Sequence, residues 1–90
     1  MKRISVRVRG KVQGVYYRAS TVTKAQQLGV KGFVRNEPDG SVYLEAEGDE
    51  DKLNQLIAWC KIGPPRAHVD EVIVENHADL RNFGNFEIVR

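Results

Sequence analysis

The chain opens with a strict alternation of hydrophobic and polar side chains. Residues 4–9 alternate in this way, and the run ends at Gly10. A period of two is typical of a strand that buries one face. The polar positions of this run are Ser5, Arg7 and Arg9. We therefore expect a half-buried strand whose polar face is basic.

Two later segments carry hydrophobic residues at helical spacing. The first spans residues 18–28, where Val22, Ala25 and Leu28 recur, and Gly29 follows where a glycine commonly ends a helix. The second follows the acidic residues 49–51, and its apolar positions, spaced i, i+3, i+4 and i+7, are Leu53, Leu56, Ile57 and Cys60. We expect two amphipathic helices, the second stabilised at its start by acidic capping and by the helix dipole.

Four further runs indicate strands. Residues 30–36 and 42–47 are rich in β-forming side chains and are separated by a Pro-Asp-Gly turn at residues 38–40. Proline presets φ, aspartate supplies a side-chain acceptor and glycine permits positive φ, so these two runs predict a hairpin. Residues 69–75 and the short run 86–88 resume the strand pattern.

The predicted order is βαββαβ with a short fifth strand, the split βαβ arrangement of α+β ferredoxin-like folds. Because crossover connections are right-handed, we expect an antiparallel sheet with two helices on one face and the third strand between the first two. The first two strands would then run parallel. The loop after Gly10 and the side chain of Asn36 would emerge at the same sheet edge, with their roots roughly 10 Å apart.

Composition narrows the class of protein. Of 90 residues, 41% are hydrophobic and 29% charged, as in ordinary globular proteins, so we expect residues 1–90 to form a single domain. The longest apolar run, residues 56–60, is too short to cross a membrane, and one cysteine cannot form an internal disulfide. We expect a cytoplasmic protein without a membrane segment. We also expect a monomer, because no apolar stripe remains once both helices pack.

The net charge of +2 hides an uneven distribution. Residues 1–36 carry nine basic and no acidic residues, whereas residues 37–90 carry five basic and twelve acidic ones. The two halves can neutralise each other as neighbouring strands. Alternatively, the basic half binds nucleic acid, phosphate or another anion. The sequence is consistent with both interpretations.

The connection from the first strand to the first helix contains Gly10, Gly14 and Arg18. Glycines let backbone N–H groups converge, a helix start offers unpaired donors, and an arginine can bind two phosphate oxygens. These features suit an oxyanion. A plain tight connection with a surface arginine also explains them, because neither the Walker spacing nor GxGxxG is present.

Asn36 ends the second strand just before the turn. Its carbonyl oxygen can accept a hydrogen bond from a water molecule and so orient that water without acting as a base. Asparagine is also a common turn-opening residue, and the position alone favours this second role.

Other reactive side chains suggest no site. Cys60 lies on the apolar face of the second helix and is expected to pack in the core. His68 and His77 lack the spacing of metal ligands. We therefore expect no structural metal.

Two longer motifs are more specific. The chain resembles the acylphosphatase family over nearly its whole length, with the family's first signature present as GKVQGVYYR at residues 10–18 and the second as GFVRNEPDGSV at residues 32–42. Gly48, GPPRAHV at residues 63–69 and FEI at residues 86–88 are similar to later segments of the family. One departure is Tyr17, where the family more often has Phe or Met, and its extra hydroxyl needs a partner.

The resemblance implies a small enzyme that hydrolyses the carboxyl-phosphate bond of acyl phosphates without metal or cofactor. Arg18 would bind the phosphate, and Asn36 would place the attacking water. The backbone N–H groups that would complete the phosphate cradle belong to Val15, Tyr16, Tyr17 and Arg18. The implied partner is a small-molecule acyl phosphate, with no nucleic acid and no membrane.

Two alternatives remain open. Residues 31–34, Lys-Gly-Phe-Val, are similar to an RNA-recognition strand, but Tyr43 on the next strand lies among Glu45 and Glu47, which would repel phosphates. The second alternative is a non-catalytic domain that keeps the same scaffold and senses an anion or binds a partner.

Overall fold

The computed structural model describes residues 1–90, which form a five-stranded sheet and two helices. In chain order the elements are β1 (Lys2–Lys11), α1 (Tyr17–Leu28), β2 (Lys31–Asn36), β3 (Val42–Gly48), α2 (Glu50–Cys60), β4 (His68–His77) and β5 (Phe86–Ile88). The strand, helix and hairpin patterns of the sequence therefore predicted each of these elements, with bounds that differ by one or two residues.

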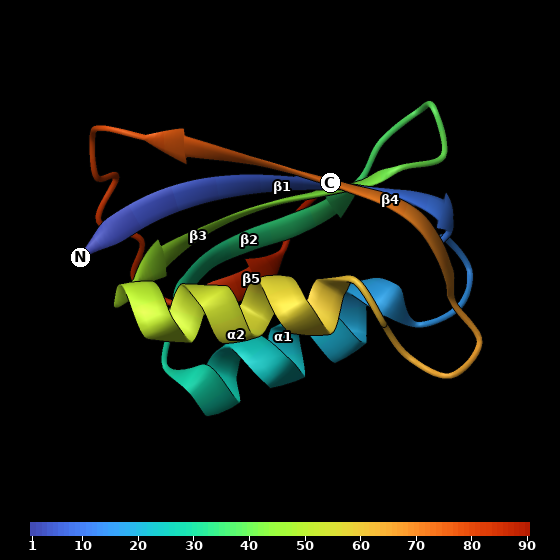
Figure 1. Ribbon diagram of the computed structural model, residues 1–90, viewed down its shortest axis with the longest axis horizontal. Coiled ribbons are helices and arrows are strands. Elements are labelled where there is room, and N and C mark those ends of the chain that lie inside the picture. Colours follow the sequence, from blue (N-terminus) through green and yellow to red (C-terminus); the bar gives the residue numbers. More distant parts are fainter.

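The strands are arranged in the order β4-β1-β3-β2-β5. β3 pairs antiparallel with both β1 and β2, so β1 and β2 run in the same direction. Figure 1 shows α1 and α2 together on one face of the sheet. The predicted ferredoxin-like fold, with β3 inserted between β1 and β2, is confirmed.

The last strand corrects the prediction of an antiparallel sheet. β5 pairs parallel with β2, with Gly32 opposite Phe86 and Val34 opposite Ile88, so the sheet is mixed. The reason is where the preceding strand ends. Arg3, near the start of β1, lies opposite His77, so β4 ends at the same end of the sheet at which β2 begins. A short connection along that end starts β5 in the direction of β2.

The core lies between the sheet and the helices. Ile4, Val6 and Val8 of β1 are buried, as their alternation predicts. On α1 the inner face differs from the prediction, since the buried residues are Tyr17, Thr21 and Ala25, whereas Val22 and Leu28 are only half-buried. Thr21 can be buried because its hydroxyl donates to the carbonyl oxygen of Tyr17 at 2.8 Å.

The second helix follows its pattern more closely. Leu53, Leu56 and Cys60 are buried on its inner face. Asp49 is the N-cap residue, but its side chain makes no capping hydrogen bond, so the predicted capping by this side chain is wrong. Glu50 and Asp51 do lie in the first turn, where they oppose the positive end of the helix dipole.

The sheet face that bears no helix carries an ionic cluster, covered by residues 78–85 between β4 and β5. Arg3, which is 4% exposed, donates to Glu45 at 2.7 Å and to Asp79 at 2.9 Å. The carboxylate of Glu47 is also buried, and it accepts the backbone N–H groups of Arg81, Asn82 and Phe83. Charge-assisted hydrogen bonds therefore hold this connection on the sheet.

No helix has both the length and the apolar character needed to cross a membrane.

Candidate active site

The loop between β1 and α1 is anchored by two valines. Val12 and Val15 are 1% and 4% exposed, so the loop is packed into the core on both sides of Gly14. Gly14 has φ of 74° and Tyr16 has φ of 65°, which are left-handed conformations. A tyrosine rarely adopts such a conformation, and strain of this kind is found at functional sites. The chain thus turns sharply just before α1.

Gly10 lies at the end of β1 rather than in the loop itself. Its φ is 135°, and the pairing of β1 with β4 is irregular between Arg9 and Gly10. A Cβ atom at Gly10 would lie 2.1 Å from the carbonyl oxygen of His68. Only glycine fits this close approach of two strands, so Gly10 sets the direction in which the chain enters the loop.

The start of α1 offers free backbone donors. Tyr16 is the N-cap residue, and its side chain makes no capping hydrogen bond. None of the backbone hydrogen bonds outside the regular elements is donated by the N–H groups of Val15, Tyr16, Tyr17 or Arg18. Unpaired N–H groups at a helix start, together with the positive end of the helix dipole, form a favourable site for an anion.

Asn36 is the last residue of β2 and lies opposite Val42. Its Oδ1 atom is buried and has no hydrogen-bond partner within the protein. No other buried side-chain oxygen or nitrogen is left without a partner. Because a buried polar atom without a partner is costly, this oxygen is suited to accept a hydrogen bond from a water molecule or a ligand.

Arg18 and Asn36 line the same hollow, whose volume is about 250 Å³. The guanidinium of Arg18 makes none of the protein's ion pairs. The residues around the hollow are Val12, Gly14, Tyr16, Tyr17, Arg18, Ala19, Asn36 and Ile88. Arg18, which makes no ion pair, therefore lines the same small space as the first residues of α1 and Asn36.

The turn after Asn36 is held by side chains. Asp39 accepts the backbone N–H and the hydroxyl of Ser41 at 2.9 and 2.6 Å, and these bonds hold the pKa of Asp39 below its usual range. Gln13 of the loop donates to the carbonyl oxygens of Glu37 and Ser41. The turn and the loop are therefore in direct contact.

The hydroxyl of Tyr17 has found a partner. It donates to the carbonyl oxygen of Cys60 at 2.7 Å, and the ring packs against Trp59 with the centroids 5.4 Å apart. Burial raises the pKa of Tyr17 above its ordinary value, so the phenol is a neutral donor. Tyr17 therefore ties the start of α1 to the end of α2.

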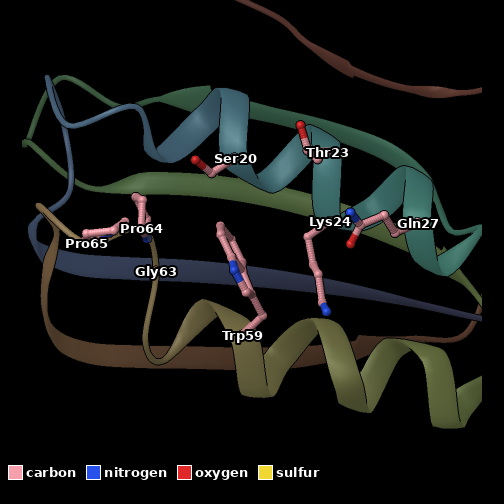
Figure 2. A pocket seen from close by; sticks show the side chains of 8 residues that line it. All are labelled: Ser20, Thr23, Lys24, Gln27, Trp59, Gly63, Pro64 and Pro65. Carbon is pink, nitrogen blue, oxygen red and sulfur yellow. The ribbon is translucent and has the colours of Figure 1, made fainter.

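The larger hollow of the molecule lies elsewhere. It measures about 440 Å³ and is lined by Ser20, Thr23, Lys24, Gln27, Trp59, Gly63, Pro64 and Pro65. Figure 2 shows it between α1 and α2, with Lys24 and Trp59 extending toward it from the two helices. None of the predicted site residues lines this groove, so the predicted chemistry belongs to the smaller hollow.

The remaining reactive side chains lie apart from one another. Burial raises the pKa of the Cys60 thiol to about 12, in agreement with packing in the core. His68 is exposed and lies 3.1 Å from Asp70, and Nε2 of His77 lies 2.9 Å from the hydroxyl of Ser5. No three His, Cys, Asp or Glu side chains gather as a group that could hold a metal ion.

Two residues at this site were not singled out by the sequence pattern. Ile88 lines the hollow because β5 lies beside β2, and a run of three residues carries no signal for that pairing. Gln13 lies within the first motif without a distinguishing pattern of its own, and its contact with the turn depends on how the loop folds.

Comparison with known proteins adds an independent observation. The sequence model of the acylphosphatase family matches residues 4–88. The chain is 50% identical to the acylphosphatase of Methylococcus capsulatus over 90 residues, which cover 100% of this chain and 98% of that protein. The crystal structure of acylphosphatase from Bacillus subtilis matches with a TM-score of 0.98 and 32% identity, covering 100% of both chains. The structure of an acylphosphatase from Coxiella burnetii matches with a TM-score of 0.93 and 38% identity, covering 98% of this chain and 92% of that one.

Proposed function

The chain belongs to the acylphosphatase family and is a hydrolase acting on acyl phosphates, and we propose that it uses Arg18 and Asn36 for this reaction without a metal ion. The observation that carries the proposal is the hollow shared by these two residues, in which the buried Oδ1 of Asn36 has no protein partner.

The phosphate group binds at the start of α1. The Arg18 guanidinium donates to two of its oxygens, and the backbone N–H groups of Val15, Tyr16, Tyr17 and Arg18 donate to the others. These donors carry positive or partial positive charge toward a group that carries negative charge. Val12 and Val15 support this proposal, because burial of their side chains holds the loop in place before substrate arrives.

Asn36 places the attacking water. Its carbonyl oxygen accepts a hydrogen bond from the water and turns the water's lone pair toward phosphorus. An amide is too weak a base to take the proton, so that proton goes to a phosphate oxygen of the substrate. The water oxygen then forms a bond to phosphorus while the bond from phosphorus to the acyl oxygen breaks. The electron pair of the broken bond leaves with the carboxylate.

The leaving group explains why so few residues suffice. A carboxylate whose conjugate acid has a pKa of about 4 leaves without protonation, so no general acid is needed. Phosphoryl transfer passes through a loose transition state in which charge lies on three equatorial oxygens. Arg18 and the oriented N–H groups stabilise that charge, and we propose that this replaces the role that a metal ion has in other phosphoryl-transfer enzymes.

The same proposal covers the form in which the protein acts. Residues 1–90 constitute one domain that works as a monomer on small acyl phosphates and not on nucleic acid. On the sheet face that bears no helix, Arg7 and Arg35 lie over the ring of Tyr43. Both are already paired, since they contact Glu37 at 3.4 and 3.1 Å. This pairing leaves them less able to bind a phosphate backbone.

The first test is hydrolysis of benzoyl phosphate in EDTA by the purified protein and by the variants Arg18→Ala and Asn36→Ala. We expect full activity in EDTA. Removing one oriented hydrogen-bonding group costs about 10²- to 10³-fold in turnover, so Asn36→Ala should lose about that much while its affinity for inorganic phosphate persists. Arg18→Ala should lose turnover and phosphate affinity together.

Each outcome bears on a separate part of the proposal. Activity that disappears in EDTA and returns with Mg²⁺ would contradict the metal-free reaction. Near-normal turnover of Asn36→Ala would contradict the placement of water. Binding of phosphate by Arg18→Ala with unchanged affinity would contradict the phosphate site.

A further inference from the structure

Gln13 joins the phosphate loop to the turn that follows Asn36. Its Nε2 atom donates to the carbonyl oxygen of Glu37 at 2.8 Å and to that of Ser41 at 2.9 Å. A carboxamide NH₂ group has two protons, so both are used. The side chain is half-buried, which limits competition from water for these two bonds.

The two carbonyl groups are those that close the turn. The oxygen of Ser41 also accepts the N–H of Glu37 at 2.9 Å, and the oxygen of Glu37 also accepts the N–H of Gly40 at 3.1 Å. Gln13 therefore binds the turn at its narrowest point. Because Glu37 directly follows Asn36, any movement of this point moves Asn36 with it.

No other hydrogen bond connects the two segments. β3 pairs with both β1 and β2, with Val42 opposite Val8 on one side and Asn36 on the other, so the sheet holds the ends of these strands. Arg7 of β1 also donates to Glu37 and Ser41, but neither contact reaches the loop that follows β1. The bonds donated by Gln13 are the only ones between residues 12–16 and residues 36–41. The side chain of Asn36 has no protein partner at Oδ1, so its direction depends on where the main chain lies.

We propose that Gln13 is a positioning residue that fixes the gap between the phosphate loop and Asn36, and hence where the water stands relative to phosphorus. This inference rests on the proposed roles of Arg18 and Asn36. Misplacement by 1 Å can cost about 10²-fold in rate. Phosphate binding is affected little, because the buried side chains of Val12 and Val15 anchor the loop separately.

The first experiment compares Gln13→Met with the matched control Gln55→Met, whose side chain is exposed on α2. Methionine keeps the length of glutamine and removes both donors. We expect kcat for benzoyl phosphate to fall by about 10- to 100-fold in Gln13→Met, while the inhibition constant of inorganic phosphate changes by less than about two-fold. The control should change neither. Unchanged kcat, or a parallel loss of phosphate affinity, would contradict the proposal.

A double-mutant cycle tests whether Gln13 acts through Asn36. In the Asn36→Ala background, Gln13→Met should cost less than about three-fold more, since the residue it positions is already gone. An equal loss in both backgrounds would overturn the inference while leaving the proposed function intact. If Asn36→Ala alone keeps normal turnover, it is the proposed function that fails.

Gln13→Glu gives a second variant and a different readout. An ionised carboxylate has no proton to donate, whereas a protonated carboxyl has one. The turnover of this variant, divided by that of the unchanged protein at the same pH, should therefore rise as the pH falls from 7 toward 4.5. A purely structural role predicts a constant ratio, and that result would contradict the inference.

Discussion

At the scale of a residue, Tyr17 has two functions, one through its backbone and one through its side chain. Its backbone N–H lies in the proposed phosphate cradle, while its hydroxyl binds the carbonyl oxygen of Cys60 at the end of α2. The last carbonyl groups of a helix have no partner within the helix, so this bond satisfies a group that would otherwise be buried and free. Compared with a Phe or Met at this position, the tyrosine adds a hydrogen bond to the packing.

Replacing Tyr17 by Phe should therefore lower the free energy of unfolding. The ring and its packing are kept, but the Cys60 carbonyl loses its donor, which costs about 1 to 3 kcal/mol. Urea unfolding followed by far-ultraviolet circular dichroism measures this change. The matched control is Tyr16→Phe, whose side chain is 75% exposed and should shift the free energy by less than about 0.5 kcal/mol. Equal stability of the two variants would contradict the capping role.

Sequence patterns predicted some residues of the site and not others, for a physical reason. Arg18 and Asn36 were found because each lies in a motif and because parallel strands place their ends at one edge. Gln13 and Ile88 were not predicted to lie at the site, because their positions depend on loop conformation and on the partner of a three-residue strand. Neither the loop conformation nor the strand pairing can be inferred from the local sequence. The assigned roles of all four remain predictions until variants are measured.

At the scale of an element, the carboxylate of Glu47 holds most of the middle of the connection between β4 and β5. Glu47 is 2% exposed and accepts three backbone N–H groups of residues 81–83. Phe83 from the same connection packs on Phe33 of β2, with the ring centroids 5.7 Å apart. Together with the bonds from Arg3 to Asp79, the connection is thus held by charge at two points and by an aromatic contact at a third.

We expect Glu47→Gln to destabilise the protein by about 2 kcal/mol, because the N–H groups lose a charged acceptor and face an NH₂ group. The loss should be local, so amide hydrogen exchange should accelerate first in residues 78–85 and β5. Glu75→Gln on β4 serves as the control, since Glu75 is exposed and has no hydrogen-bond or ion-pair partner through its side chain. If exchange in residues 78–85 stays slow, Glu47 is not what holds them.

Periodicity predicted elements well where burial decides the pattern, and poorly where polar groups are buried. The alternation in β1 and the i, i+3, i+4, i+7 spacing in α2 both match buried faces. Thr21, Glu45 and Glu47 are buried too, but only because each has partners elsewhere in the chain. Sequence patterns predict that a polar residue is exposed unless its hydrogen-bond partners are known.

At the scale of the whole molecule, the uneven charge distribution has a structural explanation. Five of the nine basic residues in the first 36 pair with acids from the second part of the chain, and they are Lys2, Arg3, Arg7, Arg9 and Arg35. Of the paired acids, Glu45 and Glu71 lie on the strands beside β1, and the others lie in a turn, in α2 and in the connection before β5. The two halves thus neutralise part of each other's charge. Arg18 is among the basic residues that make no ion pair, which fits the alternative that part of the basic half is free for an anion.

These pairs give stability a dependence on pH. Burial alone would raise the pKa of Glu45, but hydrogen bonds from Tyr43 and Arg3 more than offset it, so the pKa of Glu45 is lowered. A hydrogen bond from Arg3 lowers the pKa of Asp79. Near pH 4 the unfolded chain then binds more protons than the folded one, so stability is complete above that range and is lost on acidification from about pH 5 downward.

Urea unfolding at pH 7, 5, 4 and 3 checks this expectation. The free energy of unfolding should fall between pH 5 and pH 3, and Asp79→Asn should flatten the fall because one of the carboxyl groups with a lowered pKa is removed. Glu87→Gln is the control, since Glu87 is exposed and makes no ion pair. A free energy that stays level down to pH 3 would contradict the assignment of these carboxyl groups.

The contact between Tyr17 and Trp59 also has an optical consequence. Trp59 is the only tryptophan of the chain, and its ring lies between the two helices (Figure 2), 5.4 Å from the ring of the residue next to Arg18. Indole emission responds to the polarity and motion of its surroundings, so every photon collected from this protein above the tyrosine band comes from one place. Because the backbone N–H of Tyr17 belongs to the proposed phosphate cradle, a change in this emission on addition of phosphate would report a movement at the start of α1.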